Sequence, residues 1–515
     1  MCNFWFLCAS WLFLIMHKDW LLVKIVLGGV MNIPLISKIY IEKLFGLYTY
    51  TLPDEGELSN ASILYGDNGV GKSTILRLVF HLLSSAGDRG HRNALFNAPF
   101  ESLEVTLSNG VKLEAVRPDV EDAESFINGW GRDLRLSISK DGVLIGRWDF
   151  NPERPRGGEG AYSSGRTDIY RSRSYLSKVS SKMSYSEYAR AMSNQGRLAL
   201  GDDISNEVYG ELAYITSLEQ NVPTMFILNA DRRLDCDAVS DPSDEIELRQ
   251  VMRFEEPKRI NDLVVRSREI ALSQALSSAA KWVSAKAVQS ANLGSENVHS
   301  VYVNVVKHLV STSKKKAEEG LPNTDDLLKM LAEIENKSNE LAVYELAAPL
   351  SISELKKSLT TRSKPKRDLA AGLLKPYVES LKGRIEAVDP IYNVLHRFVK
   401  IVNDFLTDKT IEYKVSKGFS IVSPLGSCLT PNHLSSGEQQ LLLLFCYVLT
   451  GRDKSCVFMI DEPEISLNVK WQRKLVKTLL DITEGANIQF VFASHSIELL
   501  TQHRNRVVKL VNENV

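Results

Sequence analysis

The sequence predicts an α/β protein that has a mixed sheet with an antiparallel β-subdomain, plus a mainly helical insertion. Three observations predict it. A glycine-rich turn at 66–73 follows the apolar run Ala61–Tyr65 and precedes an apolar pattern of helical period, which gives strand, turn and helix. Val457–Ile460 and Ile488–Ala493 are short apolar runs typical of buried parallel strands. Between these ends of the chain, two alternating segments surround an Asn-Gly and an Asp-Gly pair, as hairpins do.

The glycine-rich turn fits the pattern G-x-x-x-x-G-K-[ST] at every fixed position. Its glycines let backbone N–H groups face phosphate oxygens, and the following helix adds the positive end of its dipole. We expect Lys72 to reach the β- and γ-phosphates of ATP and Ser73 to ligate Mg²⁺. A chance match in a loop is the alternative, and the flanking strand and helix argue against it. The expected nucleotide-binding residues here are Gly66, Asp67, Asn68, Gly69, Val70, Gly71, Lys72, Ser73 and Thr74.

Polar residues follow both late apolar runs. Asp461 and Glu462 stand at the carboxyl end of the first run, where α/β sheets bind ligands. We expect Asp461 to hold Mg²⁺ and Glu462 to orient and polarise the attacking water. His495 follows the second run and is expected to donate to the γ-phosphate or to that water. Acids at strand ends are common and a lone loop histidine is usually solvated, so the assignment depends on the phosphate-binding turn in the same chain.

Several motifs together resemble a known family. The run Leu434–Gln440 resembles the signature motif of ATP-binding-cassette (ABC) ATPases. With Asp461–Leu467 and Ser494–Ser496 after it, the chain resembles the soluble branch that contains RecF, Rad50, SMC and OLD-type proteins. The resemblance covers about residues 36–110 and 400–505 and implies an ABC-ATPase (RecF/Rad50-like) head that uses ATP and Mg²⁺.

The resemblance also implies a partner. In that family the signature serine and glycine, here Ser436 and Gly437, contact the γ-phosphate bound to the opposite subunit, and we expect Ser435 and Glu438 to take part. The chain would then form a head-to-head homodimer, or a higher homo-oligomer, with two ATP molecules sandwiched between subunits.

Two positions depart from the family pattern. The glutamine loop is not obvious, and Asn229 or Asp231 is the candidate for its place. Position 468, often histidine in OLD-like chains, is Asn468.

Composition limits the class of protein. The chain has 515 residues, 44% apolar and 24% charged, and a net charge of −1, so no overall field attracts nucleic acid or membrane. Its six cysteines are scattered without a C-x-x-C pair, which is typical of a reducing compartment without a zinc site. We therefore expect a cytoplasmic protein with no membrane partner. The apolar runs within residues 1–30 are too short to span a bilayer.

The chain is expected to divide into six segments. They are 1–30, an apolar extension that we interpret as a mis-annotated start; 31–150, an ATPase N-lobe with the phosphate-binding turn and hairpins; 151–220, a mobile Gly/Ser/Arg-rich segment and helices; 221–259, a strand and connector; 260–403, a helical insertion; and 404–515, an ATPase C-lobe with the signature motif, the acid pair and His495.

Two basic stretches leave alternatives open. Residues 151–182 are rich in Gly, Ser and Arg with interleaved tyrosines, which favours a mobile loop over a single-stranded nucleic-acid contact. The insertion lacks the sustained heptads of a long coiled coil, so a compact helical insertion is expected. It holds six cations without an intervening acid, which form either a solvated loop or a phosphate or partner contact. They are Lys356, Lys357, Arg362, Lys364, Lys366 and Arg367.

These features favour an ATP-driven sensor or regulator of a separate effector. The chain resembles the ATPase subunits of bacterial antiviral defence systems, first of the Septu type, including retron-associated forms, and second of the PARIS type. In Septu-like systems the partner is an HNH nuclease. The alternative is a RecF/Rad50-like DNA repair clamp. The nucleotide-binding subunit of a transporter is less favoured, because the insertion between the two halves of the site is large.

Overall fold

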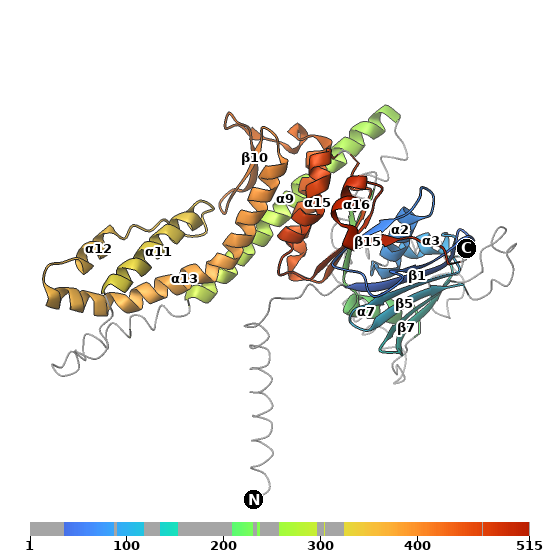
Figure 1. The fold of residues 1–515 in the computed structure, drawn as a ribbon, viewed down its shortest axis with the longest axis horizontal. Coiled ribbons are helices and arrows are strands. Elements are labelled where there is room, and N and C mark those ends of the chain that lie inside the picture. Colours follow the sequence, from blue (N-terminus) through green and yellow to red (C-terminus); the bar gives the residue numbers. More distant parts are fainter. Residues whose placement is uncertain are drawn as a thin grey trace, which may run out of the picture. The chain divides into compact units, whose positions relative to one another are not determined.

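A computed structural model describes residues 35–86, 90–117, 134–152, 209–229, 234–236, 257–295, 303, 324–465 and 467–513. The predictions for 1–30, for 153–182 and for Asp231 lie outside the described residues. The chain forms two compact units (Figure 1), one made of 1–255 with 451–515 and the other of 256–450. We call them the sheet unit and the helical unit. The expected C-lobe, 404–515, is divided between them.

The sheet unit contains a mixed six-stranded sheet with the order β15-β3-β14-β13-β8-β9. All neighbours are parallel except β8 and β9, which pair antiparallel. The strands are β3 (Ala61–Tyr65), β8 (Thr224–Leu228), β9 (Leu234–Cys236), β13 (Cys456–Asp461), β14 (Ile488–Ala493) and β15 (Val507–Lys509). β13 and β14 are buried at every position, which explains why their sequences are continuous apolar runs rather than alternating ones.

A second, antiparallel sheet has the order β2-β1-β4-β5-β6-β7. Its strands are β1 (Ile36–Leu44), β2 (Tyr48–Leu52), β4 (Ser102–Leu107), β5 (Val111–Val116), β6 (Leu134–Lys140) and β7 (Val143–Phe150). The two predicted hairpins are confirmed as β4–β5 and β6–β7, with Gly110 and Gly142 at positive φ in their turns. The alternating burial of β4, β5 and β6 places one face of this sheet in the core.

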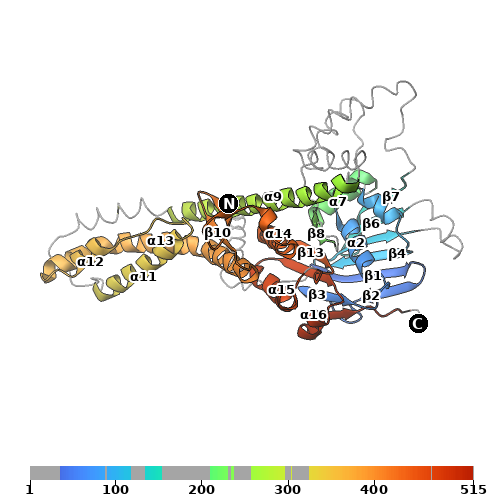
Figure 2. The same cartoon turned by 90° about the horizontal axis from the view of Figure 1, so that it is seen from above.

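Helix α2 (Lys72–Leu83) contacts β5 of the antiparallel sheet and β8, β13 and β14 of the mixed sheet (Figure 2). Its apolar residues join both sheets in one core, in which Leu76, Val105 and Met459 are at most 1% exposed. Burying an apolar side chain of this size contributes about 1.5–3 kcal/mol. The helix that begins at the phosphate-binding turn is therefore fixed from two sides. Further helices of this unit are α3 (His91–Phe96), α7 (Glu211–Asn221), α15 (Val469–Ile482) and α16 (Ile497–Gln502).

The helical unit is built on two long antiparallel helices that lie side by side, as Figures 1 and 2 show. α9 (Pro257–Ser295) has 39 residues and α13 (Lys364–Phe405) has 42, so α13 is about 60 Å long. Because sustained heptads are lacking, we expected a compact helical insertion and did not predict helices of this length. The reason is that α13 packs on a series of different partners along its length, and a coiled coil would need one repeating partner.

Smaller elements complete the helical unit. They are α11 (Thr324–Ala342), α12 (Ser353–Leu359), the three-stranded sheet β10 (Thr410–Lys414), β11 (Gly418–Val422) and β12 (Cys428–Leu429), and α14 (Ser436–Thr450). α14 is buried along most of its length, as its apolar sequence predicts. In the part of the chain that the structure describes, no helix is long and apolar enough to cross a membrane.

Candidate nucleotide site

The turn between β3 and α2 requires glycine at two positions. Gly69 and Gly71 have φ of 85° and 95°, which residues with a side chain rarely adopt. At Gly71 a Cβ would also lie 2.6 Å from the Cδ2 atom of Leu44. Leu44 and Phe45 thus lie against the turn, and no local pattern in the sequence predicts this contact.

Lys72 reaches back across the turn. Its Nζ donates hydrogen bonds to the carbonyl oxygens of Gly66 and Asp67, both at 2.8 Å. Lys72 is buried, and this burial lowers the pKa of its ammonium group, although the nearby acids, Glu462 first among them, oppose the shift. The cation is therefore held inside the turn that the sequence assigns to phosphates.

Ser73 and Asp461 meet beside it. The Ser73 hydroxyl donates to Oδ1 of Asp461 at 2.7 Å, and the carboxylate is only 2% exposed. Burial raises the pKa of Asp461, while the Ser73 hydrogen bond and the Arg77 guanidinium 4.0 Å away act in the opposite direction. A hydroxyl and a carboxylate at one point are oxygen ligands of the kind that Mg²⁺ prefers.

Mg²⁺ commonly uses few protein ligands and completes its shell with phosphate oxygens and water. The Ser73–Asp461 pair therefore fits a magnesium ion that arrives with a nucleotide.

The three parts of the expected site come from the ends of three neighbouring strands. Because β14 pairs in parallel with β3 on one side and β13 on the other, Leu64, Ala493 and Asp461 lie in register. Glu462 follows in a left-handed conformation, with φ 47°, and its N–H donates to the Ala493 carbonyl at 2.8 Å. His495 follows β14 and is partly buried. The carboxyl edge of the sheet thus gathers the turn, the acids and the histidine.

Glu464 is a residue that sequence reasoning did not single out. Its carboxylate accepts hydrogen bonds from the Ser494 hydroxyl at 2.9 and 3.0 Å and from the His495 N–H at 2.8 Å. The only signal in the sequence was a third acid, two positions after the Asp461–Glu462 pair. Asn468, noted as a departure, caps α15 by accepting from the N–H of Trp471 at 2.9 Å.

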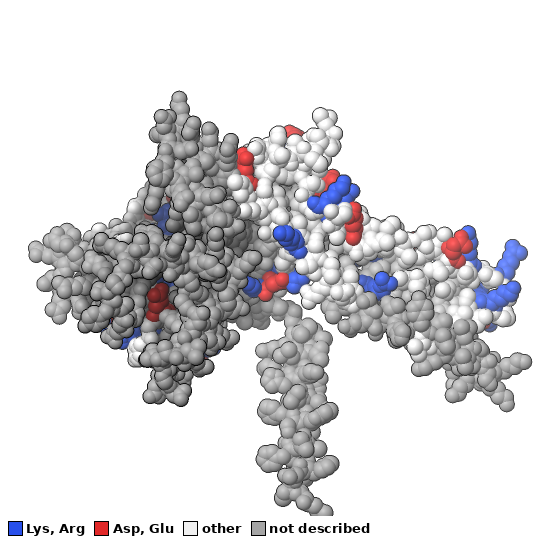
Figure 3. Space-filling model, turned by 180° about the vertical axis from the view of Figure 1, so that it is seen from behind, with Lys and Arg blue, Asp and Glu red and all other residues white. Residues whose placement is uncertain are grey.

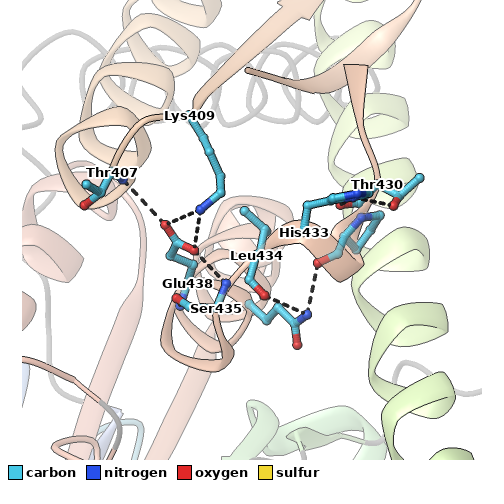
Figure 4. A network of polar contacts seen from close by, with 9 residues as sticks. Thr407, Lys409, Thr430, His433, Leu434, Ser435 and Glu438 are labelled. Atoms are coloured by element: carbon cyan, nitrogen blue, oxygen red, sulfur yellow. Dashed lines mark hydrogen bonds and ion pairs between the residues drawn. The ribbon is translucent and has the colours of Figure 1, made fainter. Parts of the chain in front are cut away.

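The signature residues lie in the helical unit, at the start of α14 (Figure 4). The Glu438 carboxylate accepts from the Ser435 N–H at 2.7 Å and the Ser435 hydroxyl accepts from the Glu438 N–H at 3.4 Å, which is a capping box. Lys409 Nζ also lies 3.2 Å from this carboxylate, which is 4% exposed. Burial alone would raise the pKa of Glu438, but the bonds from Ser435 and Lys409 hold the pKa below its ordinary value.

These contacts separate the roles of the four expected signature residues. Ser435 and Ser436 are exposed at the start of the helix, whereas Gly437 and Glu438 are buried. The carboxylate of Glu438 faces protein groups that hold the helix start in place. Of the two candidates for the glutamine loop, Asn229 directly follows β8 and is half-buried.

Part of the chain matches a known protein family. Residues 334–501, which include the signature, the acids and His495, match the family model described as "AAA domain, putative AbiEii toxin, Type IV TA system". The chain is similar over these residues to ATPase domains of the AAA/ABC type. The phosphate-binding turn lies outside the matched residues.

Curated relatives match over short stretches of this domain. An ABC transporter ATP-binding protein of Clostridium acetobutylicum is 28% identical over 111 residues, which is 21% of this chain and 39% of that protein. The molybdenum import ATP-binding protein ModC of Escherichia coli is 32% identical over 85 residues, or 16% of this chain and 23% of that protein. The chain thus spans well under half of each of these two relatives.

Solved structures with similarity include an Smc head domain from Pyrococcus furiosus, bound to the C-terminal domain of ScpA. It has 11% identity and a TM-score of 0.31, and the match covers 91% of this chain and 92% of that one. An Smc head domain from Pyrococcus yayanosii has 13% identity and a TM-score of 0.29, covering 93% and 97%.

Proposed function

We propose that the chain binds ATP with Mg²⁺ and hydrolyses it at the carboxyl edge of β3, β14 and β13. The observation that carries this proposal is the hydrogen bond from Ser73 to Asp461, because it joins the phosphate-binding turn to the acid pair. Lys72 exchanges its bonds to the turn carbonyls for the β- and γ-phosphates. Ser73 and Asp461 hold the magnesium ion, which neutralises phosphate charge when bound.

Two residues would act on the attacking water. Glu462 orients and polarises it, and its fixed backbone, bonded to Ala493, places the side chain just past the end of β13. His495 donates to the γ-phosphate or to the same water. The assignment is supported by the register of β13 with β14, which brings the ends of both strands to one edge.

We further propose that hydrolysis needs two copies of the chain. Ser435 and Ser436 are exposed at the start of α14, and the positive end of a helix dipole attracts an anion. In a head-to-head homodimer they would contact the γ-phosphate held by the other copy. Each nucleotide would then be enclosed between two subunits.

Two variants test the proposed reaction. Lys72→Ala should abolish binding of a fluorescent ATP analogue. Glu462→Gln should bind ATP normally, lose about a hundredfold or more of its hydrolysis rate, and accumulate as an ATP-bound dimer in size-exclusion chromatography with light scattering. Glu498→Gln is the matched control, because Glu498 lies in the same unit but pairs at the surface with Arg473. Wild-type turnover in Glu462→Gln would contradict the role given to Glu462.

The biological role that we propose is regulation of a separate effector, such as an HNH nuclease, in cytoplasmic antiviral defence of the Septu type or, second, the PARIS type. The placement of α14 and the two long helices in one unit supports a regulator, because a partner that binds this unit can change the position of α14, which carries the signature residues. Co-expression with the products of neighbouring genes tests this role. A nuclease that co-purifies and depends on intact Lys72 is the expected result, and a nuclease indifferent to Lys72→Ala would contradict it.

A second candidate is a RecF/Rad50-like DNA repair clamp, favoured by one surface. Figure 3 shows Lys and Arg side chains at one end of the helical unit. We define the α12–α13 basic surface as Arg362, Lys364, Lys366 and Arg367, none of which has an ion-pair partner among the described residues. A repair clamp predicts that DNA binds the chain alone and stimulates its ATP hydrolysis, whereas an effector regulator predicts stimulation by the partner.

A further inference from the structure

Glu464 joins the segment after β13 to the segment after β14. Both of its carboxylate oxygens are used, because the Ser494 hydroxyl shares its one proton between Oε1 at 3.0 Å and Oε2 at 2.9 Å, and the His495 N–H donates to Oε1 at 2.8 Å. Hydrogen bonds to a charged acceptor are roughly twice as strong as neutral ones. The backbone at His495 is therefore tied to the loop that carries the two acids.

The other side of His495 is tied to α15. The Ser496 hydroxyl donates to Oε1 of Gln472 at 2.8 Å, and the Ser496 N–H donates to the Ser494 hydroxyl at 3.0 Å. Gln472 in turn donates through Nε2 to the carbonyl of Leu467 at 2.9 Å. His495 thus stands between two anchored serines, while its own ring has no hydrogen-bond partner among the described residues.

The backbone of His495 is held by hydrogen bonds while its imidazole ring is left without one from the residues that the structure describes. This arrangement is expected of a side chain that must contact a ligand at a fixed position. Proton donation to a phosphate or water requires heavy atoms within about 3 Å of each other. An error of about 1 Å in such a placement costs up to about a hundredfold in rate.

We propose that Glu464 is a positioning residue for His495, which it holds in place for ATP hydrolysis through the peptide that joins Ser494 to His495. The inference rests on the proposed function, since it assigns His495 a part in the reaction. Glu464 itself does not donate or accept a proton in the reaction. Its main effect on the rate passes through the histidine, while its charge also acts to raise the pKa of Asp461 and of Lys72.

The kinetic test is a double-mutant cycle. Glu464→Gln should lower kcat by about tenfold to a hundredfold and leave the affinity for a fluorescent ATP analogue within about twofold. In a His495→Ala background the same change should have almost no further effect, because the residue through which Glu464 acts is gone. Glu498→Gln is the matched control and should keep wild-type kcat. Effects of Glu464→Gln and His495→Ala that multiply would overturn the proposal.

A second measurement does not depend on activity. Hydrogen exchange of a peptide covering 490–497 should speed up in Glu464→Gln, because the His495 N–H loses its charged acceptor, and should stay unchanged in Glu498→Gln, whose substitution lies outside this peptide. Unchanged exchange in Glu464→Gln overturns the proposal even if the wild type does not hydrolyse ATP, which would by itself refute only the proposed function. If Glu464→Gln melts early, Ser494→Ala removes the hydroxyl bonds and takes its place in both measurements.

Discussion

Ser73 and Asp461 are 388 positions apart in the chain, and the hydroxyl of one donates to the carboxylate of the other at 2.7 Å. This hydrogen bond arises because β14 separates β3 from β13 in the sheet, while α2 packs on both β13 and β14. The start of α2 is thereby brought to the end of β13. Two short motifs that the sequence holds at opposite ends become one site.

Asp461→Asn should abolish most hydrolysis and raise the melting temperature of the nucleotide-free protein. A loss of about a hundredfold is expected from removing a magnesium ligand. Burial raises the pKa of Asp461, so the folded state binds its proton more tightly than the unfolded state does. Ionisation of this carboxyl therefore lowers stability as the pH rises through that raised pKa.

The stabilising effect of Asp461→Asn should thus be present at neutral pH and disappear in acid, as thermal melts at several pH values would show. Ser73→Ala is the informative control. It leaves the buried carboxylate and removes its donor, so it should lower the unfolding free energy by about 1–3 kcal/mol. A lower melting temperature in Asp461→Asn at neutral pH would contradict this account.

Lys409→Met should destabilise the helical unit, because it leaves the buried Glu438 carboxylate with one partner fewer. We expect the unfolding free energy in urea to fall by about 1–3 kcal/mol, and to fall much less in a Glu438→Gln background. The control is Lys357→Met, which breaks an exposed pair with Glu354 and should cost less than about 1 kcal/mol. Equal costs for the two lysine variants would argue against a special role for the Lys409–Glu438 pair.

His81 makes the protein sensitive to acid. Burial first, and then the nearby charges of Arg92 and Arg77, lower the pKa of His81 from 6.5 to about 4. Between these values the unfolded state holds a proton that the folded state lacks, so stability falls as the pH is lowered from about 6.5 to about 4. In His81→Gln the decline in melting temperature over this range should be shallower, while His433→Gln, at an exposed histidine, should follow the wild type. Parallel curves for all three proteins would disprove the assignment.

If the chain binds nucleic acid, we expect the α12–α13 basic surface to be the binding site. Lys364→Glu with Lys366→Glu should weaken DNA binding at low salt by about tenfold, and should reduce the salt slope by about one for each phosphate that is no longer neutralised. The control reverses Lys375 and Lys382 on the same helix, which pair with Glu379 and Glu386. If both double variants bind as the wild type does, the surface is only a solvated one.

Much of the site was readable from short patterns. Strands β3, β13 and β14 lie at the predicted positions. They could be predicted because strands buried on both faces have sequences that are continuous apolar runs. Helix α2 begins at Lys72 as the glycine pattern predicts. The length of α13 was not readable, since its apolar face meets changing partners and so carries no simple repeat.

Glu464 and Glu438 show most clearly where sequence reasoning ended. Both are acids within recognisable motifs, and their chemistry depends on which donors the fold brings to them. The sequence by itself determined the phosphate-binding turn, the acid pair and the strands that carry them, because these rest on local backbone rules and burial patterns. Only the tertiary structure decided that Glu464 holds the His495 peptide and that Glu438 pairs with Lys409. A hydrogen bond between distant residues depends on strand order and register, which no local pattern encodes.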